Sequence, residues 1–378
     1  MSERINHHDN RATIRWKLLT TASALALSGY VSSINLARAE DSDRPTFWIE
    51  LGGQMEMMQG LSSPFTAPFM FITPTPAVYK GSSFTGDQRP PRFAFGEEGK
   101  ITFQPDGSDW SFSAGIRYGR SHATRHLHHQ TPGTPYTLFG SPTLFNFSAQ
   151  PFEDIKALHS ERHMVLDFSA GRDVGIGLLG RGGVSKVSAG VRLVDFKESS
   201  TVNIFARPSV TPVLIPPKYL LPAPVFHQYM LDADAKRSFK GVGPSLSWDA
   251  SAALAGNKED GELTLDWGIN AAILFGKQKA KTSHATKAYY QAAAKYASYY
   301  YTKLYEHGPH PKIRSRNVIV PNVGGFAGLS YRYADAKISF GYRADSFFGA
   351  MDTGIDTAKK SNLTFNGPYA SISIGLGD

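Results

Sequence analysis

Small or polar residues stand at every second position along several stretches of this sequence, and the charged ones among them are best placed to do chemistry. The candidates to line a water-filled interior are Arg117, Lys186, Arg192, Glu262, Asp266, Arg332, Lys337 and Arg343, with Asp167 and Asp345 on the same faces. If these faces surround water, their basic excess favours anions. The alternative is that opposite charges pair across a narrow interior and fill it. The sequence leaves both arrangements open.

A histidine-rich segment from His122 to His129 is a second candidate site. Within it, His126 and His128 form a His-x-His pair of the kind that binds zinc or copper through neutral imidazoles, and His159 and His163 could add ligands. No acidic or thiol ligand stands at a fixed spacing from the pair, so a surface loop without metal is the simpler interpretation. We therefore expect no metal and no cofactor.

Catalysis has little support in the sequence. With no cysteine, the chain cannot form disulfides, thiolate metal sites or a thiol nucleophile. The only acid and histidine combinations in predicted loops are His227 near Asp232 and Asp234, and Glu306 beside His307, and neither matches a catalytic motif. No phosphate-binding loop follows a strand, and the basic residues are spread along strands. The sequence thus predicts neither an enzyme nor a nucleic-acid-binding protein.

The stretch from Thr286 to His307 combines alanines with many tyrosines. Alanine favours helix, so we expect part of a long loop to be helical here. Such a helix could cover the mouth of the protein as a gate or as a platform on which sugars stack. The alternative is a lid that packs on its own loop.

The elements that carry the charged faces are predicted to be β-strands. Apolar and polar residues alternate strictly, which places one side chain set on each face of a strand. The main alternating runs are Thr46 to Met57, Trp110 to Gly119, His163 to Ala170, Lys186 to Leu193, Glu262 to Phe275, Leu329 to Tyr333, Lys337 to Arg343 and Tyr369 to Leu376. A mean hydropathy of -0.26 and the lack of long apolar runs after the N-terminal region disfavour membrane-spanning helices.

Connections between the runs are alternately short and long. The short ones are Pro105 to Asp109, Asp173 to Gly183, Gly256 to Gly261 and Ala334 to Ala336, and the long ones are Gln59 to Pro91, His122 to Ala157, Ser200 to Lys236, Lys279 to Val318 and Ala350 to Leu363. Outer-membrane barrels have short periplasmic turns and long extracellular loops. We predict an all-β antiparallel transmembrane barrel of about ten strands, within a range of eight to twelve. A secreted β-sandwich or soluble barrel is the alternative.

The first 39 residues are predicted to be a secretory signal. Arg11, Arg15 and Lys17 give a basic start, an apolar stretch follows from Leu18 to Ile34, and Ala37-Arg38-Ala39 is a cleavage site. The barrel domain is then expected over residues 40–378. An uncleaved anchor is the alternative.

Segments in the last third of the chain add a family resemblance. Phe239 to Leu254, Gly328 to Asp356 and Asn366 to Leu376, together with the WIELGGQ run from Trp48 to Gln54, resemble pore-forming outer-membrane proteins of the Legionella major outer-membrane protein type. The resemblance implies a β-barrel porin, and it carries no catalytic residues with it.

We therefore expect an outer-membrane, porin-like pore of a Gram-negative cell that passes small hydrophilic solutes with a mild preference for anions. The alternative is a closed structural or adhesive barrel whose surface loops bind ligands. Expected partners are outer-membrane lipid and lipopolysaccharide, small solutes and the barrel-assembly machinery, but no nucleic acid. Whether the chain forms a homo-oligomer is left open.

Overall fold

The computed structural model describes most of the chain after residue 45. The described residues are 46–59, 94–106, 108–130, 137–138, 141–142, 152–174, 184–207, 225–257, 260–293, 300–308, 311–355 and 357–376. The predicted secretory signal lies outside these residues.

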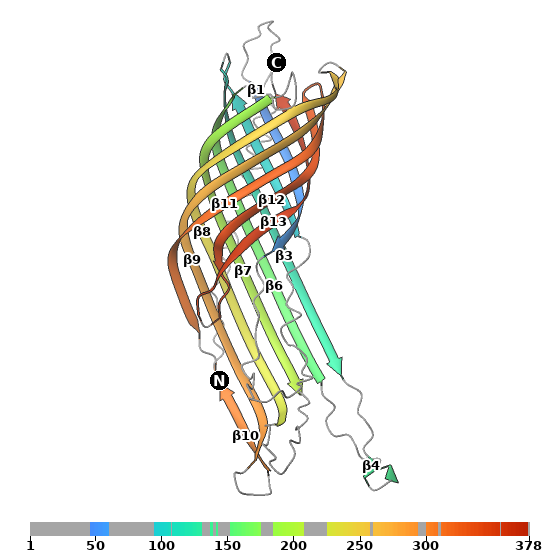
Figure 1. The fold of residues 1–378 in the computed structure, drawn as a ribbon, viewed down its shortest axis with the longest axis vertical. Coiled ribbons are helices and arrows are strands. Elements are labelled where there is room, and N and C mark those ends of the chain that lie inside the picture. Colours follow the sequence, from blue (N-terminus) through green and yellow to red (C-terminus); the bar gives the residue numbers. More distant parts are fainter. Residues whose placement is uncertain are drawn as a thin grey trace, which may run out of the picture. The chain divides into compact units, whose positions relative to one another are not determined.

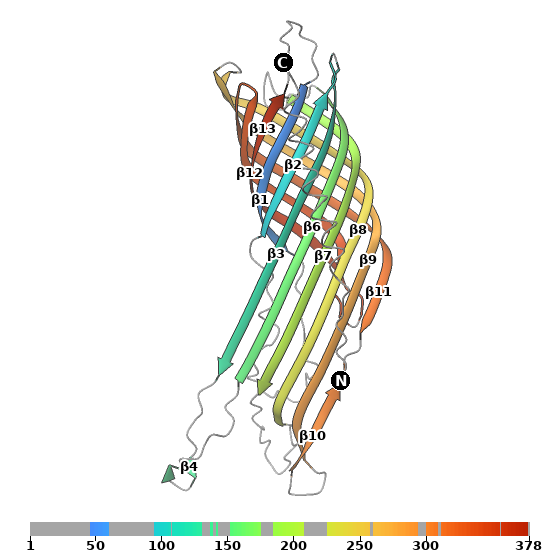
Figure 2. The same ribbon diagram turned by 180° about the vertical axis from the view of Figure 1, so that it is seen from behind.

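Ten antiparallel strands form a closed barrel (Figures 1 and 2). They are β1 (Thr46–Gln59), β2 (Ala94–Gln104), β3 (Trp110–Gln130), β6 (Phe152–Asp173), β7 (Val184–Arg207), β8 (Val225–Asn257), β9 (Gly261–Ala293), β11 (Lys312–Tyr333), β12 (Ala336–Asp352) and β13 (Lys360–Leu376). Each strand pairs with its neighbour along the chain, and β1 pairs with β13 to close the ring. The predicted all-β barrel of ten strands is confirmed.

Three further strands lie outside the ring. β10 (Tyr300–His307) pairs with the end of β9, and β4 (Thr137–Leu138) pairs with β5 (Ser141–Pro142). Among the described residues, no helix is long and apolar enough to cross a membrane.

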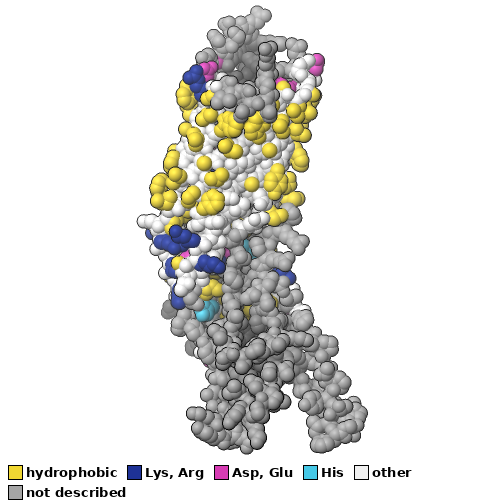
Figure 3. All heavy atoms as spheres, in the orientation of Figure 1, with side chains coloured by type: hydrophobic (Ala, Val, Ile, Leu, Met, Phe, Trp, Pro, Cys, Tyr) yellow, Lys and Arg dark blue, Asp and Glu magenta, His cyan; other side chains and the backbone are white. Residues whose placement is uncertain are grey.

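The alternation in the sequence becomes two faces of the barrel wall. Phe95, Ile269 and Phe340 point outward and keep 58% to 74% of their surface exposed. On the face drawn in Figure 3, exposed apolar side chains of this kind are spread over one level of the wall, which we call the apolar band. Because so much exposed apolar surface is unfavourable in water, the band marks the part of the wall that faces lipid.

The short turns have the local chemistry that tight connections need. Between β11 and β12 the turn places Ala334 at a φ of 48°, and the backbone N of Gly375 donates to the carbonyl of Asp335 at 2.7 Å. Between β8 and β9, Gly256 and Gly261 both have positive φ angles, which glycine adopts without steric cost. The described strand ends that these short turns connect lie at one end of the barrel, which we call the short-turn side, and the opposite end is the long-loop side.

Several strands run much further than the sequence predicted. β8 and β9 have 33 residues each, whereas about 10 residues suffice for a tilted membrane strand. We call this part beyond the apolar band the extension: residues 120–130 of β3, 152–162 of β6, 195–207 of β7, 225–240 of β8 and 277–293 of β9 (Figure 1). Large parts of three predicted loops, His122 to Ala157, Ser200 to Lys236 and Lys279 to Val318, are therefore strand.

The predicted helix is wrong where the structure describes it. β9 continues to Ala293 and β10 begins at Tyr300. Ala288 pairs with Tyr229 of β8 and with Tyr305 of β10, so its backbone is bonded to strands on both sides. The sheet on either side thus overrides the local helix preference of alanine. Residues 294–299 lie outside the described part.

Candidate functional site in the barrel interior

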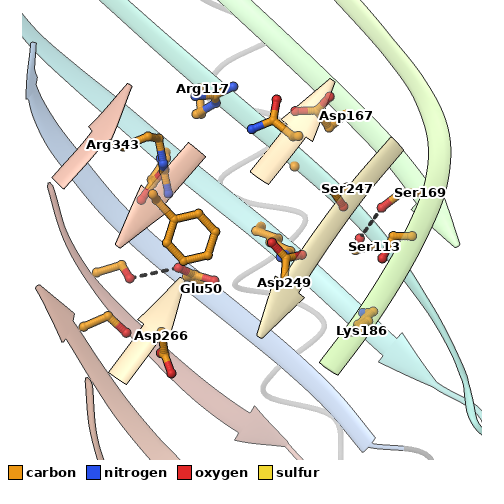
Figure 4. A pocket seen from close by; sticks show the side chains of 18 of the residues that line it. Glu50, Ser113, Arg117, Asp167, Ser169, Lys186, Ser247, Asp249, Asp266 and Arg343 are labelled. Carbon is orange, nitrogen blue, oxygen red and sulfur yellow. Dashed lines mark hydrogen bonds and ion pairs between the residues drawn. The ribbon is translucent and has the colours of Figure 1, made fainter. Parts of the chain in front are cut away.

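A polar cavity of about 390 Å³ lies inside the barrel at the level of the apolar band. Nine strands contribute polar or charged side chains to it, and Figure 4 shows Arg117, Asp167, Lys186, Asp249 and Arg343 around one space. These side chains come from alternate positions of their strands, which is why the same strands are apolar outside. We call this space the polar chamber.

Most charges in the polar chamber are paired across it. Arg192 donates from Nε to Asp167 Oδ1 at 2.6 Å, and Lys337 Nζ lies 2.6 Å from Asp266 Oδ2. Arg117 on β3 pairs with Asp345 on β12, and these two strands are not neighbours in the sheet. Arg343 likewise pairs with Glu98 on β2 and stacks 4.8 Å from the ring centre of Tyr369. Paired charges occupy much of the interior, as the filled arrangement requires.

The predicted interior residues all lie on inward-facing positions. Six line the polar chamber: Arg117, Lys186, Arg192, Asp266, Lys337 and Arg343. Glu262 and Arg332 lie closer to the short-turn side, where the guanidinium carbon of Arg332 is 5.5 Å from the ring centre of Trp48. That any of the eight contacts a passing solute stays a prediction.

Sequence reasoning missed several charges of the polar chamber. Glu98 and Lys100 on β2 and Asp249 on β8 line it, and Glu50 on β1 joins them. Glu50 lies on the polar face of the first alternating run, Thr46 to Met57. With them, the lining holds six cations and five carboxylates. The basic excess that motivated an anion preference is therefore reduced to one charge in this lining.

An apolar layer closes the interior on the long-loop side of the polar chamber. Its largest members are Phe196, Phe239, Leu274, Val320, Phe347, Met351, Leu363 and Phe365, each at most 5% exposed. They come from six strands, and the rings of Phe196 and Phe347 meet edge to face at 4.7 Å between centres. Since these side chains fill the centre of the barrel, no open path crosses the described interior.

The connection between β12 and β13 folds inward and covers this layer. We call its described residues, 348–355 and 357–359, the inner segment. It begins at a bulge where Gly349 has a φ of 70°. Gln278 Nε2 donates to the carbonyl of Ala350 at 2.9 Å, and Arg237 Nη2 donates to the carbonyl of Thr353 at 3.2 Å. β8 and β9 are not neighbours of β12 in the sheet, so these bonds cross the interior.

Further bonds hold the tip of the inner segment. Arg314 of β11 donates to Asp352 Oδ2 at 2.9 Å and to the carbonyl of Ile355 at 2.7 Å, and Thr282 donates to the same carbonyl at 2.8 Å. Burial would raise the pKa of Asp352, but hydrogen bonds from Arg314 and from the backbone of Lys359 and Gly354 hold it below its usual value. The prediction of an external loop at Ala350 to Leu363 is therefore wrong for its first half.

A buried acid and histidine cluster lies beside the apolar layer. The ring of His163 sits between Glu56 Oε2 at 3.0 Å and Glu161 Oε1 at 3.1 Å. Further into the extension, Arg237 donates to Glu198 Oε1 at 2.9 Å, and both side chains are fully buried. Burial raises the pKa of Glu198 to about 7, although Arg237 opposes the shift.

The histidines proposed as metal ligands do not converge. His126 lies on the outward face of β3, half exposed, and its Nε2 contacts Asp154. His128 is also exposed, whereas His159 and His163 lie on the inward face of β6. Among the described residues, no three histidine or carboxylate groups come together as a metal site would need.

The loop candidates for catalysis do not come together either. Asp232 accepts a hydrogen bond from Asn203 at 2.6 Å and Asp234 from Thr201 at 2.7 Å, both on the outward face of the extension. Glu306 lies 3.9 Å from Lys287. The side chains of His227 and His307 lie outside the described part.

A ten-stranded antiparallel barrel with an apolar outer band and a polar interior defines the class of outer-membrane β-barrel proteins. Residues 84–375 match the family model described as Legionella pneumophila major outer membrane protein precursor, which is more than half of the chain. The chain belongs to this family, and its place is the cell outer membrane. The resemblance noted in the sequence is confirmed.

Comparisons with curated sequences and with solved structures do not narrow the function further. No curated protein sequence matches this chain significantly. Among solved structures, a TodX deltaS2S3 mutant monoaromatic hydrocarbon channel is 10% identical over 89% of this chain and 91% of its own, with a TM-score of 0.21. The P. putida toluene transporter TodX is 10% identical with the same coverage and a TM-score of 0.18. Outer-membrane expressed OmpT of Vibrio cholerae is 8% identical over 90% of this chain and 100% of its own, with a TM-score of 0.15. Similarities this low carry no conclusion about this chain.

Proposed function

We propose that the protein is an outer-membrane channel for small hydrophilic solutes and that the structure corresponds to its closed state. The observation that carries the proposal is the polar chamber at the level of the apolar band. Its volume of about 390 Å³ has room for on the order of ten water molecules, at roughly 30 Å³ each. A barrel that served only as a scaffold would be more stable with this space filled.

The lining of the polar chamber favours uncharged or zwitterionic solutes. Carboxylates, guanidinium groups and the serine hydroxyls of Ser113, Ser169 and Ser247 offer both hydrogen-bond donors and acceptors. Because cations and carboxylates nearly balance, no strong selection by charge is expected. The proposal accordingly does not include an anion preference.

Opening requires the inner segment to leave the barrel. As long as Gln278, Thr282 and Arg314 hold it, the apolar layer beneath stays covered and solutes cannot pass from the long-loop side. The segment is attached at only two points of the chain, the ends of β12 and β13, so it can move without breaking the barrel wall.

Conductance in planar lipid bilayers tests the proposal. Asp352 of β12 pairs directly with Lys360 of β13, so a two-residue Asn-Gly turn can replace residues 353–359 and keep the hairpin register. The variant lacks the carbonyl groups of Thr353 and Ile355 that anchor the segment packed on the apolar layer. We expect rare, brief conductance steps from the natural protein and more frequent ones from the shortened variant. Lys360→Gln changes one exposed charge beside the same hairpin and should behave like the natural protein.

The competing function is a closed structural or adhesive barrel. The observation that favours it is the extension, in which β8 and β9 continue well beyond the apolar band. If neither the natural protein nor the shortened variant conducts while both are folded, the channel proposal fails. Loss of surface attachment in cells that lack the protein would then support the adhesive barrel.

A further inference from the structure

Basic side chains cluster on the outer face of five adjacent strands where the apolar band ends on the long-loop side. Figure 3 shows lysine and arginine side chains gathered directly beyond the band. We call the following outward-facing residues the basic belt: Arg120, Arg162, Lys197, Lys236, Lys240, Lys277, Lys279 and Lys281. They come from five adjacent strands, β3, β6, β7, β8 and β9.

The strand register brings these cations side by side. Arg120 pairs directly with Arg162, and Arg162 pairs directly with Lys197. The same row continues through Ser238 to Lys279. Lysines stand opposite each other on either side of this row, Lys236 against Lys281 and Lys240 against Lys277. Like charges directly opposite each other destabilise a sheet, so four such pairs need a compensating anion.

The protein itself supplies little compensation. Asp195 Oδ2 lies 3.5 Å from Lys197 Nζ and 3.4 Å from Lys240 Nζ. Within the part of the chain that the structure describes, no carboxylate lies within 4.0 Å of Arg120, Arg162, Lys236, Lys277, Lys279 or Lys281. The basic belt therefore carries a large net positive charge.

A surface depression of about 450 Å³ lies over the centre of the basic belt. Arg162, Lys197, Lys236, Lys279 and Lys281 line it, and hydroxyls of Ser160, Ser199 and Ser238 stand between them. Immediately towards the membrane, Val242 pairs with Phe275 as the last apolar row, and both are about half exposed. The same surface thus offers cations and hydroxyls next to an apolar wall.

The other edge of the apolar band is different. Among the described outward-facing residues on the short-turn side, the cation is Arg172, which is paired with Asp109 at 2.8 Å. In outer-membrane barrels the long-loop side faces the cell exterior. The positive charge is consequently confined to the edge that meets the outer leaflet.

We propose that the basic belt binds the phosphorylated headgroup of the outer-leaflet glycolipid. Phosphate oxygens would accept hydrogen bonds from Arg162, Lys197 and Lys279, and the acyl chains would lie along Val242 and Phe275. Guanidinium and ammonium groups are the usual phosphate partners in proteins. A bound anionic headgroup would also relieve the repulsion between the facing cations.

Binding of defined lipids to the purified full-length protein tests this inference. Lipid A with both phosphates is the probe, measured by native mass spectrometry in detergent. We compare the natural protein with Arg162→Gln, Lys197→Gln and Lys279→Gln combined. Since each cation near an anionic lipid surface contributes roughly fivefold in affinity, we expect binding to weaken on the order of 100-fold.

A second triple variant controls for charge alone. Lys156→Gln, Lys287→Gln and Lys360→Gln combined remove three cations outside the basic belt, and this variant should bind lipid A as the natural protein does. Heat-dependent gel mobility establishes that both variants remain folded barrels. Equal binding by all three proteins, or an equal loss in both variants, overturns the inference.

Two further lipids identify the ligand class. Lipid A stripped of its phosphates should bind the natural protein no better than it binds the belt variant. Phosphatidylglycerol carries a phosphate on a different scaffold and should bind more weakly than lipid A. If phosphatidylglycerol binds equally well, the assignment to the glycolipid is wrong.

Discussion

The wall at the apolar band and the wall of the extension are built from the same strands, yet their faces are inverted. On β7, Leu193 faces outward to lipid and Arg192 faces the polar chamber. A few residues on, Lys197 faces outward and Phe196 lies in the apolar layer. The adjacent apolar residues Leu193 and Val194 mark the point of inversion. The strand keeps its regular backbone, and the same alternate positions continue to face outward. The alternation of apolar and polar residues shifts by one position in the sequence, so the outward positions change from apolar to charged and the inward positions from polar to apolar.

The inversion explains where the barrel interior becomes filled with apolar side chains. Near the end of the apolar band the polar lining of the interior gives way to packed apolar side chains such as Leu274 and Phe196. Beyond the band the outer face meets water and carries exposed charges, whereas the charges inside, such as Arg237 and Glu198, are buried in pairs.

Removing Arg237, the buried cation of the extension, should lower the free energy of unfolding the most. Arg237→Ala leaves Glu198 without its charged partner in a fully buried position. Breaking one side of a buried ion pair costs about 3–5 kcal/mol. Urea unfolding followed by tryptophan fluorescence should show this loss. Replacing both residues, Arg237→Met with Glu198→Gln, should recover much of it, and equal losses in the single and double variants would contradict the pairing.

Shortening a side chain of the apolar layer should lower the free energy of unfolding more than shortening an outward-facing side chain at the same level of the barrel. Leu274→Ala opens a cavity at a fully buried position, which we expect to lower the free energy of unfolding by about 3 kcal/mol. Its neighbour Ile273 is 51% exposed to the lipid side, and Ile273→Ala should cost clearly less. The same unfolding assay compares them. Similar losses would mean that the two faces are not distinguished as described.

A charge on the outer face should be tolerated only beyond the apolar band. Ile269→Lys places an ammonium group in the band, where we expect a cost of about 2 kcal/mol in lipid vesicles. Asn203→Lys, on the exposed outer face of the extension, should leave stability unchanged. Folding yields into vesicles provide the measurement. Equal yields would place Ile269 outside lipid.

The smallest effect concerns the inner segment. Asp352→Asn weakens the contacts with Arg314 and with two backbone N–H groups, and we expect a loss of about 1 kcal/mol. The lowered pKa of this carboxyl means that its stabilisation is present above about 3.8 and is lost as the pH falls further.

Hydrogen exchange of residues 350–355 measures this effect. The natural protein should lose protection in acid below that pH, whereas the variant should show less pH dependence. Identical profiles would show that Asp352 does not hold the segment.

The barrel could be predicted from sequence because its signal is local. Alternating residues such as those from Leu263 to Phe275, and short turns such as Ala334 to Ala336, specify strands and their order without knowledge of distant contacts. The inward position of the eight charged candidates follows from the same alternation. Their pairing does not, since Arg117 and Asp345 are far apart in the chain and only barrel closure brings them together.

The extension and the inner segment could not be predicted for related reasons. Where the apolar pattern shifts at Leu193 and Val194, the strand continues but its outer face becomes charged, which looks like the start of a loop. The inner segment is defined by bonds from Arg237, Gln278 and Arg314, each on another strand. No spacing within Ala350 to Leu363 reveals those partners.

The pairing of β1 with β13 also determines the order in which the protein can assemble. Its contacts join the two ends of the barrel domain, as when Ser371 donates to Glu50, 321 residues away at 2.8 Å. The entropy of closing so long a chain must be lost before this seam contributes any stability. Every other pair of neighbouring strands in the ring is consecutive along the chain and can form as a hairpin. The seam should thus form last, and until it does the growing sheet presents two unpaired edges that are open to aggregation or to a helper protein.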